Sequence, residues 1–201
     1  MTQPFDTPAT AGPTLCTAFA GSRRIASGDL REVALQVKEV IDQGERAPVL
    51  IFDEFSSHLI EVDFRGTAEE VLKRLEPTGE EARRPGRPKL GVVAREVTLL
   101  PRHWEWLNIQ PGGASAALRR LVEQARRANA ARDRIRQAQE SAYRFLSAMA
   151  GNEAGFEEAT RALFAGRPDG FAEHSASWPA DIRDHALKLA AAAFERPPAA
   201  G

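Results

Sequence analysis

Residues 92–122 have the sequence VVAREVTLLPRHWEWLNIQPGGASAALRRLV, and this segment is the most informative about the architecture. Apolar and polar residues alternate over 92–100, which is typical of a strand with one buried face. Pro101 suits the first turn of a helix, where its missing N–H would have no partner. We therefore predict a strand over 92–100, a short helix over 102–109 and, after the break at 111–113, a second and longer helix.

The longer helix is predicted because apolar residues recur at helical spacing from Leu118 as far as Ala150. In the tail, the same criterion predicts two more helices, over 154–164 and 179–194. We expect a loop over 165–178 to join them.

Upstream, residues 15–76 predict a small α+β unit. The predicted elements are strands over 15–20, 49–52 and 59–64, a short extended segment near Ile25, a helix from the start signal at 27–29 to Gly44, and a helix through Leu75 opened by a capping box of Thr67 and Glu70. Over 59–64, Ile60, Val62 and Phe64 alternate with charged residues, as a half-buried strand requires.

The fold class predicted from these elements is α+β, with a small N-terminal α/β unit, a central strand-helix-helix segment and a helical C-terminal part. The corresponding division of the chain is a disordered tail (1–14), a small α+β domain (15–76), a basic linker (77–91), a strand, helix and long helix (92–150), a helical C-terminal unit (151–195) and a tail (196–201).

Composition favours an ordinary globular protein, since 43% of the 201 residues are hydrophobic and 27% are charged. No apolar run approaches the roughly 20 residues that cross a bilayer, and no signal peptide is predicted. The one cysteine, Cys16, has no partner for an internal disulfide, which fits a reducing compartment. We expect a soluble, cytoplasmic protein that does not interact with a membrane.

Charge is unevenly distributed, although the net charge of the chain is only −1. Residues 83–136 contain thirteen Arg or Lys and four acids, which makes this segment +9 and the remainder −10. A local surplus of arginine favours an anionic partner such as nucleic acid. The alternative is that these arginines solvate a long helix and pair with acids elsewhere.

Residues 93–127 resemble a ribbon-helix-helix unit, in which a strand pairs with its copy in a second chain and the ribbon enters the DNA major groove. The resemblance implies a homodimer, and strand residues facing DNA at Ala94, Glu96 and Thr98. Glu96 departs from the polar or basic residue expected, and a register shifted by one would turn Arg95 outward instead. The implied core positions are Val97, Leu99, Trp104, Leu107, Leu118 and Val122.

One alternative stays open for this segment, namely a strand-helix-helix element that packs into a larger core. Trp104 and Trp106 are candidates for stacking on bases. Trp104 shares a helical face with Leu107 and is predicted to be core, whereas Trp106 lies on another face and is the better candidate for a contact.

Before the ribbon-helix-helix-like segment, the run Arg83-Arg84-Pro85-Gly86-Arg87-Pro88-Lys89 resembles an AT-hook. That motif implies that Arg87 enters an A·T-rich minor groove, where the negative potential is enhanced. Pro85 departs from the motif, which has arginine before the glycine. The alternative is a basic hinge.

Catalytic patterns are scarce, so we predict that the chain is not an enzyme and has neither cofactor nor metal. No glycine-rich phosphate loop and no nucleophile elbow occurs. Asp181 and His185 are four residues apart on a predicted helix and, with His174, match no established metal site. We interpret them as an exposed Asp–His pair. Cys16 is predicted to be a small buried hydrophobic residue.

Over most of residues 15–195 the chain resembles an uncharacterised prokaryotic family, the domain of unknown function 2239. The resemblance is most specific over 86–122 and over the stretch 178–185, Trp-Pro-Ala-Asp-Ile-Arg-Asp-His. The family implies no activity.

The function predicted from the residues is binding of duplex DNA through 83–127, by a dimeric transcriptional regulator. The candidate nucleic-acid-binding residues are Arg83, Arg84, Arg87, Lys89, Arg95, Thr98, Arg119, Arg120 and Arg126. The alternative is a non-enzymatic interaction or scaffold protein that binds another protein through its helical tail.

Overall fold

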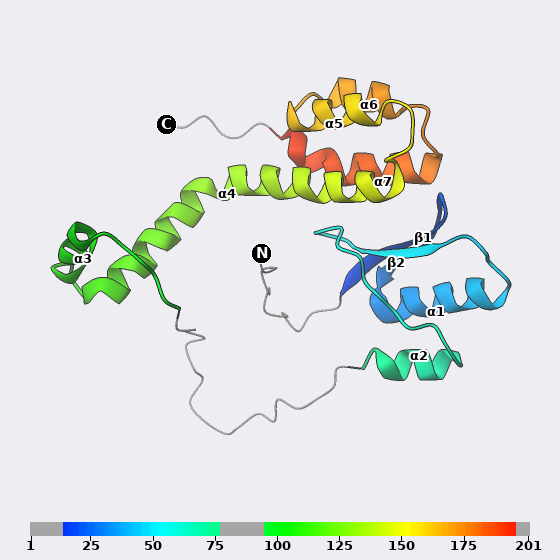
Figure 1. The fold of residues 1–201 in the computed structure, drawn as a ribbon, viewed down its shortest axis with the longest axis horizontal. Helices are drawn as coiled ribbons and strands as arrows, with labels where there is room; N and C mark the ends of the chain where they lie inside the picture. The colour runs from blue at the N-terminus through cyan, green and yellow to red at the C-terminus, as the bar shows by residue number, and fades with distance from the viewer. Residues whose placement is uncertain (1–13, 77–94, 196–201) are drawn as a thin grey trace. The chain divides into compact units, whose positions relative to one another are not determined.

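The computed structural model describes residues 14–76 and 95–195, which form two compact units. The first unit contains 14–76 together with 134–195, and the second contains 95–133. Figure 1 shows the elements of both. The predicted α+β class is confirmed, because the structure combines a three-stranded antiparallel sheet with helices.

The elements follow the chain in a strand-rich part and then a helical part. The strands are β1 (Leu15–Ala20), β2 (Arg23–Asp29) and β3 (Val49–Asp53), and the helices are α1 (Leu30–Asp42), α2 (Ala68–Arg74), α3 (Pro101–Asn108), α4 (Gly113–Met149), α5 (Phe156–Phe164), α6 (Pro168–Ser175), α7 (Ala180–Ala190) and the short 3-10 helix η1 (Ala191–Phe194).

The sheet has the order β2-β1-β3, so the first strand of the chain lies in the middle. Thr17 of β1 is opposite Ser27 on one side and Phe52 on the other. Gly21, with φ +55°, makes the tight turn between β1 and β2, in a backbone region that glycine adopts without strain.

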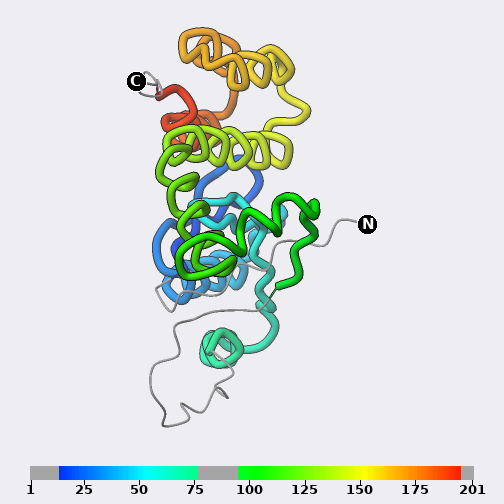
Figure 2. Tube along the Cα trace, turned by 90° about the vertical axis from the view of Figure 1, so that its left-hand side faces the viewer, coloured from blue at the N-terminus to red at the C-terminus, as the bar shows by residue number. Residues whose placement is uncertain are grey.

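Alternation along the strands sends side chains into two separate cores. Cys16, Ala18 and Ile51 pack with α1, whereas Phe19 and Phe52 pack with α4, α5 and α7. Figures 1 and 2 show α1 on one side of the sheet and α7 on the other. The sheet of the first unit is thus a middle layer between helices.

Local capping signals in the sequence are confirmed. Asp29 accepts a hydrogen bond from the backbone N–H of Arg31 and begins α1 where it was predicted. At α2, the hydroxyl of Thr67 accepts from Glu70 N–H while the Glu70 carboxylate accepts from Thr67 N–H, which is the predicted capping box.

The strand predicted over 59–64 is wrong. Only an isolated bridge from Leu59 to Phe52 forms there, although Ile60, Val62 and Phe64 do pack against the α1 core at the predicted alternate spacing. Part of the reason is that the backbone carbonyl of Asp63 accepts a hydrogen bond from the side chain of Arg74 rather than from a neighbouring strand.

The loop predicted over 165–178 is also wrong, because it contains α6. Pro168 begins that helix, and its buried residues are Phe171 and Ser175. The Ser175 hydroxyl donates to the Phe171 carbonyl oxygen at 2.7 Å. Burial of Phe171 in the larger core stabilises a helix too short to be recognised from its own sequence.

Of the strand predicted over 92–100, only residues 95–100 are described, and they form no strand within this chain. A ribbon would pair them with a second chain, so the pairing stays a prediction. The AT-hook-like run 83–89 lies outside the described residues.

Phe145 lies at the centre of the core that the sheet forms with α4, α5 and α7. The centroid of its ring is 5.4 Å from that of Phe19 and 5.2 Å from that of Phe52. Phe145→Ala should lower the free energy of unfolding by about 3–5 kcal/mol, measured by urea denaturation. The control is Tyr143→Ala, two residues away on the exposed side of α4, which should cost no more than about 1.5 kcal/mol. If the two variants lowered the free energy of unfolding equally, Phe145 would not be a residue of this core.

Candidate nucleic-acid interface

Four arginines share one face of α4 within the second unit. Arg119 and Arg126 are seven residues apart, as are Arg120 and Arg127, and seven residues are close to two helical turns. All four side chains are exposed. We call this set (Arg119, Arg120, Arg126 and Arg127) the basic face.

The basic face keeps most of its hydrogen-bonding capacity free. Arg126 donates to Glu123 at 2.8 Å, and Arg119 Nε donates to the Ser115 carbonyl oxygen at 3.3 Å. Within the described part of the chain, Arg120 and Arg127 form no ion pair. Exposed ion pairs contribute at most about 1 kcal/mol, so even Arg126 can exchange its partner for a phosphate, which guanidinium groups bind bidentately.

The helix that carries this face starts from a glycine pair. Gly112 and Gly113 have φ of +83° and +74°, and a Cβ on Gly112 would come within 2.9 Å of the Ala116 Cβ. Glycine therefore permits the chain to leave α3 and enter α4. Ala and Arg then dominate the first half of α4, and both are good helix formers.

The structure brings together three of the predicted site residues, Arg119, Arg120 and Arg126. Arg95 and Thr98 are exposed in the segment before α3 and take no part in the basic face. The other four candidates, Arg83, Arg84, Arg87 and Lys89, lie outside the described residues. Sequence reasoning missed Arg127, although its spacing of seven from Arg120 would have identified it.

The core implied by the ribbon-helix-helix resemblance is present only in part within one chain. Leu107 is buried, and Leu99, Trp104 and Leu118 are half-buried. Val97 and Val122 are exposed. Since that core would form between two chains, the dimeric arrangement stays a prediction.

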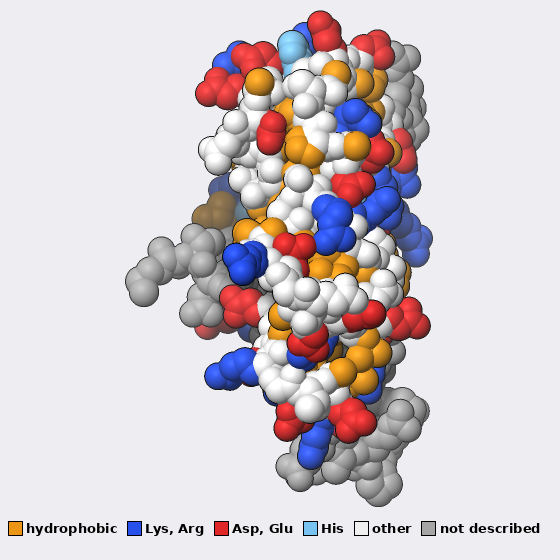
Figure 3. Space-filling model, turned by 90° about the vertical axis from the view of Figure 1, so that its right-hand side faces the viewer, with side chains coloured by type: hydrophobic (Ala, Val, Ile, Leu, Met, Phe, Trp, Pro, Cys, Tyr) orange, Lys and Arg blue, Asp and Glu red, His pale blue; other side chains and the backbone are white. Residues whose placement is uncertain are grey.

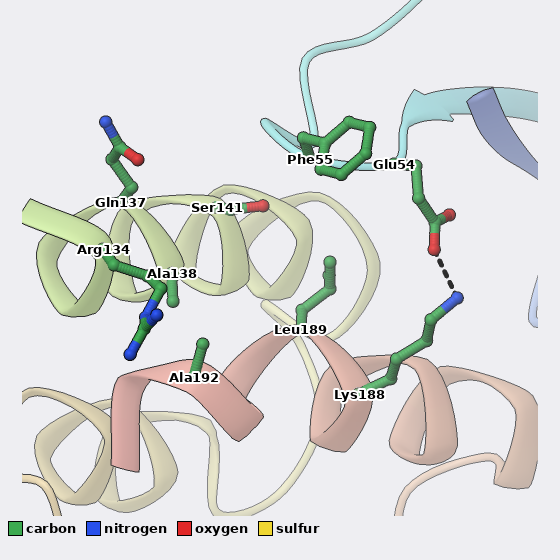
Figure 4. A pocket seen from close by; sticks show the side chains of 9 residues that line it. All are labelled: Glu54, Phe55, Arg134, Gln137, Ala138, Ser141, Lys188, Leu189 and Ala192. Atoms are coloured by element: carbon green, nitrogen blue, oxygen red, sulfur yellow. Dashed lines mark hydrogen bonds and ion pairs between the residues drawn. The ribbon is translucent and has the colours of Figure 1, made fainter. Parts of the chain in front are cut away.

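The first unit has a different kind of site, a cavity of about 260 Å³ between α4, α7 and the turn after β3 (Figure 4). Its charged groups are already paired. Lys188 bonds to Glu54, which also accepts from the Thr17 hydroxyl at 2.9 Å, and Arg134 bonds to Glu195. Burial acts to raise the pKa of Glu54, but the hydrogen bonds from Lys188 and Thr17 outweigh it and hold that pKa below its usual value.

Acidic and basic side chains are interspersed on the face drawn in Figure 3, so that this surface has no strong field of one sign. In the basic face, four arginines lie on one side of a helix, and one of them, Arg126, is paired with an acid, Glu123. The second unit is therefore the better candidate for binding an anionic polymer.

His185 is not part of an exposed pair with Asp181, which makes that prediction wrong. It is buried, with its ring 4.7 Å from Phe145 and 5.4 Å from Phe19 between centroids. Asp181 instead accepts a hydrogen bond from the backbone N–H of Arg24 at 2.8 Å. The Nδ1 atom of His185 is buried without a hydrogen-bond partner, and burial lowers the pKa of His185 to about 4.

Cys16 is fully buried in the α1 core, as predicted. Burial, together with the charges of Asp29, Asp53 and Glu54, raises the pKa of its thiol to about 11. The thiolate needed for nucleophilic chemistry is thus scarce at neutral pH.

Two further findings apply to residues 14–76 and 95–195. No helix there combines the length and apolar character needed to cross a bilayer. Nor do three or more His, Cys, Asp or Glu side chains come together in a way that could hold a metal ion.

A family model described as "Uncharacterized protein conserved in bacteria (DUF2239)" matches residues 15–190. The match runs from the start of β1 to the end of α7 and so includes both units. It confirms the resemblance found in the sequence. No curated protein and no solved structure matches the chain.

Protonation of His185 should destabilise the first unit. Its pKa is about 4 when folded and 6.5 in its ordinary state, so the unfolded chain takes up the proton first as pH falls. The contribution of neutral His185 to the free energy of unfolding is therefore complete above pH 6.5. It decreases between pH 6.5 and pH 4, by up to about 1.4 kcal/mol per pH unit. Urea denaturation at pH 7 and pH 5 measures this, and His185→Leu should flatten the decrease. An unchanged decrease in the variant would exclude His185 as its cause.

Proposed function

The chain belongs to this bacterial family, whose description names no activity, and we propose from its own residues that it binds duplex DNA as a homodimer and regulates transcription. We assign it no catalytic activity. Its place of action would be the cytoplasm, where bacterial DNA is accessible.

The basic face of α4 is the observation that carries this proposal. Arginine is well suited to phosphate because its planar guanidinium donates two parallel hydrogen bonds. Neutralising phosphates releases counterions from DNA, which supplies much of the affinity of a DNA-binding protein. Four exposed arginines on one helical face would contact several phosphates at once.

Phosphate contacts fix the position of a protein on DNA but do not read its sequence. In this proposal, base recognition falls to residues predicted from sequence, Arg87 in the minor groove and Arg95 or Thr98 in the major groove. The basic face then supplies affinity, and the segment before α3 supplies specificity.

A second candidate function is protein binding through the helical part of the first unit. Tyr143 of α4 and Phe164 of α5 are both exposed, with ring centroids 5.7 Å apart. Exposed aromatic pairs are common at protein interfaces. Absence of DNA binding would favour this candidate.

Binding to duplex DNA should weaken steeply as salt concentration rises. Titration of a labelled duplex at several salt concentrations should give a slope of log K against log salt of about −0.9 for each phosphate bound. Arg120→Ala or Arg127→Ala should flatten that slope by about 0.9 for each phosphate that the variant no longer neutralises. The matched control is Arg161→Ala, which removes one exposed arginine from α5 and should leave the slope unchanged. No binding at low salt would overturn the proposal.

Arg87→Ala should weaken binding to A·T-rich duplex more than to G·C-rich duplex, because the arginine is predicted to enter the narrow minor groove. Competition between the two duplexes for wild type and variant measures the difference. Equal weakening on both duplexes would mean that Arg87 binds phosphate only, whereas unchanged binding would remove the run 83–89 from the interface.

A further inference from the structure

The first half of α4 exposes apolar side chains opposite the basic face. Every residue from 121 to 130 is exposed, including Leu121 at 41% and Val122 at 53%. Leu118, Leu121, Ala125 and Ala128 follow one another at spacings of three, four and three, which places them along one side of the helix. We call these four residues the seam.

The described part of the second unit buries few apolar side chains. Over residues 95–133, the buried hydrophobic side chains are Leu107 and Ala117. On α3, Trp106 is 48% exposed, and Ile109, which follows that helix, is 78% exposed. Helices of this kind owe most of their stability to tertiary packing of an apolar face, and small domains without a sufficient core often need oligomerisation. Exposed apolar side chains on such a unit therefore favour a partner surface that covers the seam.

Charge placement indicates what the partner is. If α4 is written in heptads with Leu118 at position a, the seam occupies a and d, and the four arginines occupy b and c, on the far side. The flanking e and g positions, where helices select partners by charge, contain no charged residue: Ala117, Val122, Gln124, Asn129 and Ala131. Two copies of this basic helix can therefore approach without like-charge repulsion, which would otherwise oppose their pairing.

The seam also has a defined end. The next position of the a and d pattern is Arg132, an exposed residue, and a charged side chain there is costly in a close contact of identical helices. The stretch suited to pairing thus covers 118–128, alongside the basic face and not beyond it.

We infer that a second copy of this chain covers the seam, α4 against α4, and that the basic face stays free on the outside of the dimer. The inference deepens the proposed function, on which it rests for the role of the arginines, and it places the homodimer contact on this helix. Pairing of two such helices doubles the number of phosphates that one particle can contact.

Sedimentation equilibrium of the full chain without DNA tests the inference, with a matched pair of variants. Ala125→Glu puts a charge in the seam, whereas Ala130→Glu makes the same change five residues along the same exposed helix, on the arginine side. Wild type and Ala130→Glu should sediment at twice the 22.0 kDa of one chain. Ala125→Glu should self-associate at least tenfold more weakly, and Leu121→Glu should do the same.

Circular dichroism and urea denaturation of each full-length variant check that it stays folded. A wild-type chain that sediments as a monomer at every concentration would overturn the inference, as would equal self-association of Ala125→Glu and Ala130→Glu. Because DNA is absent, the result is separate from the DNA titration. A dimer that fails to bind DNA would overturn the proposed function and leave the interface standing.

Discussion

The packing of Phe19 and Phe52 against Phe145 is the contact on which the first unit depends. A three-stranded sheet has two apolar faces, and the N-terminal segment supplies α1 for only one of them. The second face needs helices from residues 134–195, about a hundred positions away along the chain. Two parts of the sequence that look independent are therefore one folding unit, joined through their aromatic side chains.

Prediction from sequence succeeded where a local signal determines the structure. The capping box at Thr67, the cap at Asp29 and the strand over 15–20 each depend on neighbours within a few residues, and all are present. Prediction from sequence failed where contacts between residues far apart in the chain determine the structure. The segment 59–64 has the side-chain alternation of a strand without its ladder, and α6 is stabilised by burial of Phe171 in a core formed by distant helices.

In the candidate interface, too, some features follow from local sequence signals and others depend on contacts between distant residues. The arginine surplus and its placement on a long helix follow from composition and periodicity, and both could be predicted from the sequence. Which arginines share a face follows from a spacing of seven, and this spacing is also present in the sequence, for Arg127 as for the others. Exposure of Leu121 and Val122 could not be predicted, because apolar residues at helical spacing ordinarily indicate burial within the same chain.

Cys16 has a practical consequence for work on this protein. It is the only cysteine of the chain and lies inside the α1 core with a weakly acidic thiol. Thiol-directed labels react with the accessible thiolate, so the native residue is protected while the protein is folded. A cysteine introduced on the surface of α4 would then carry a dye or spin label at one defined position, with the wild-type core left intact for fluorescence or distance measurements.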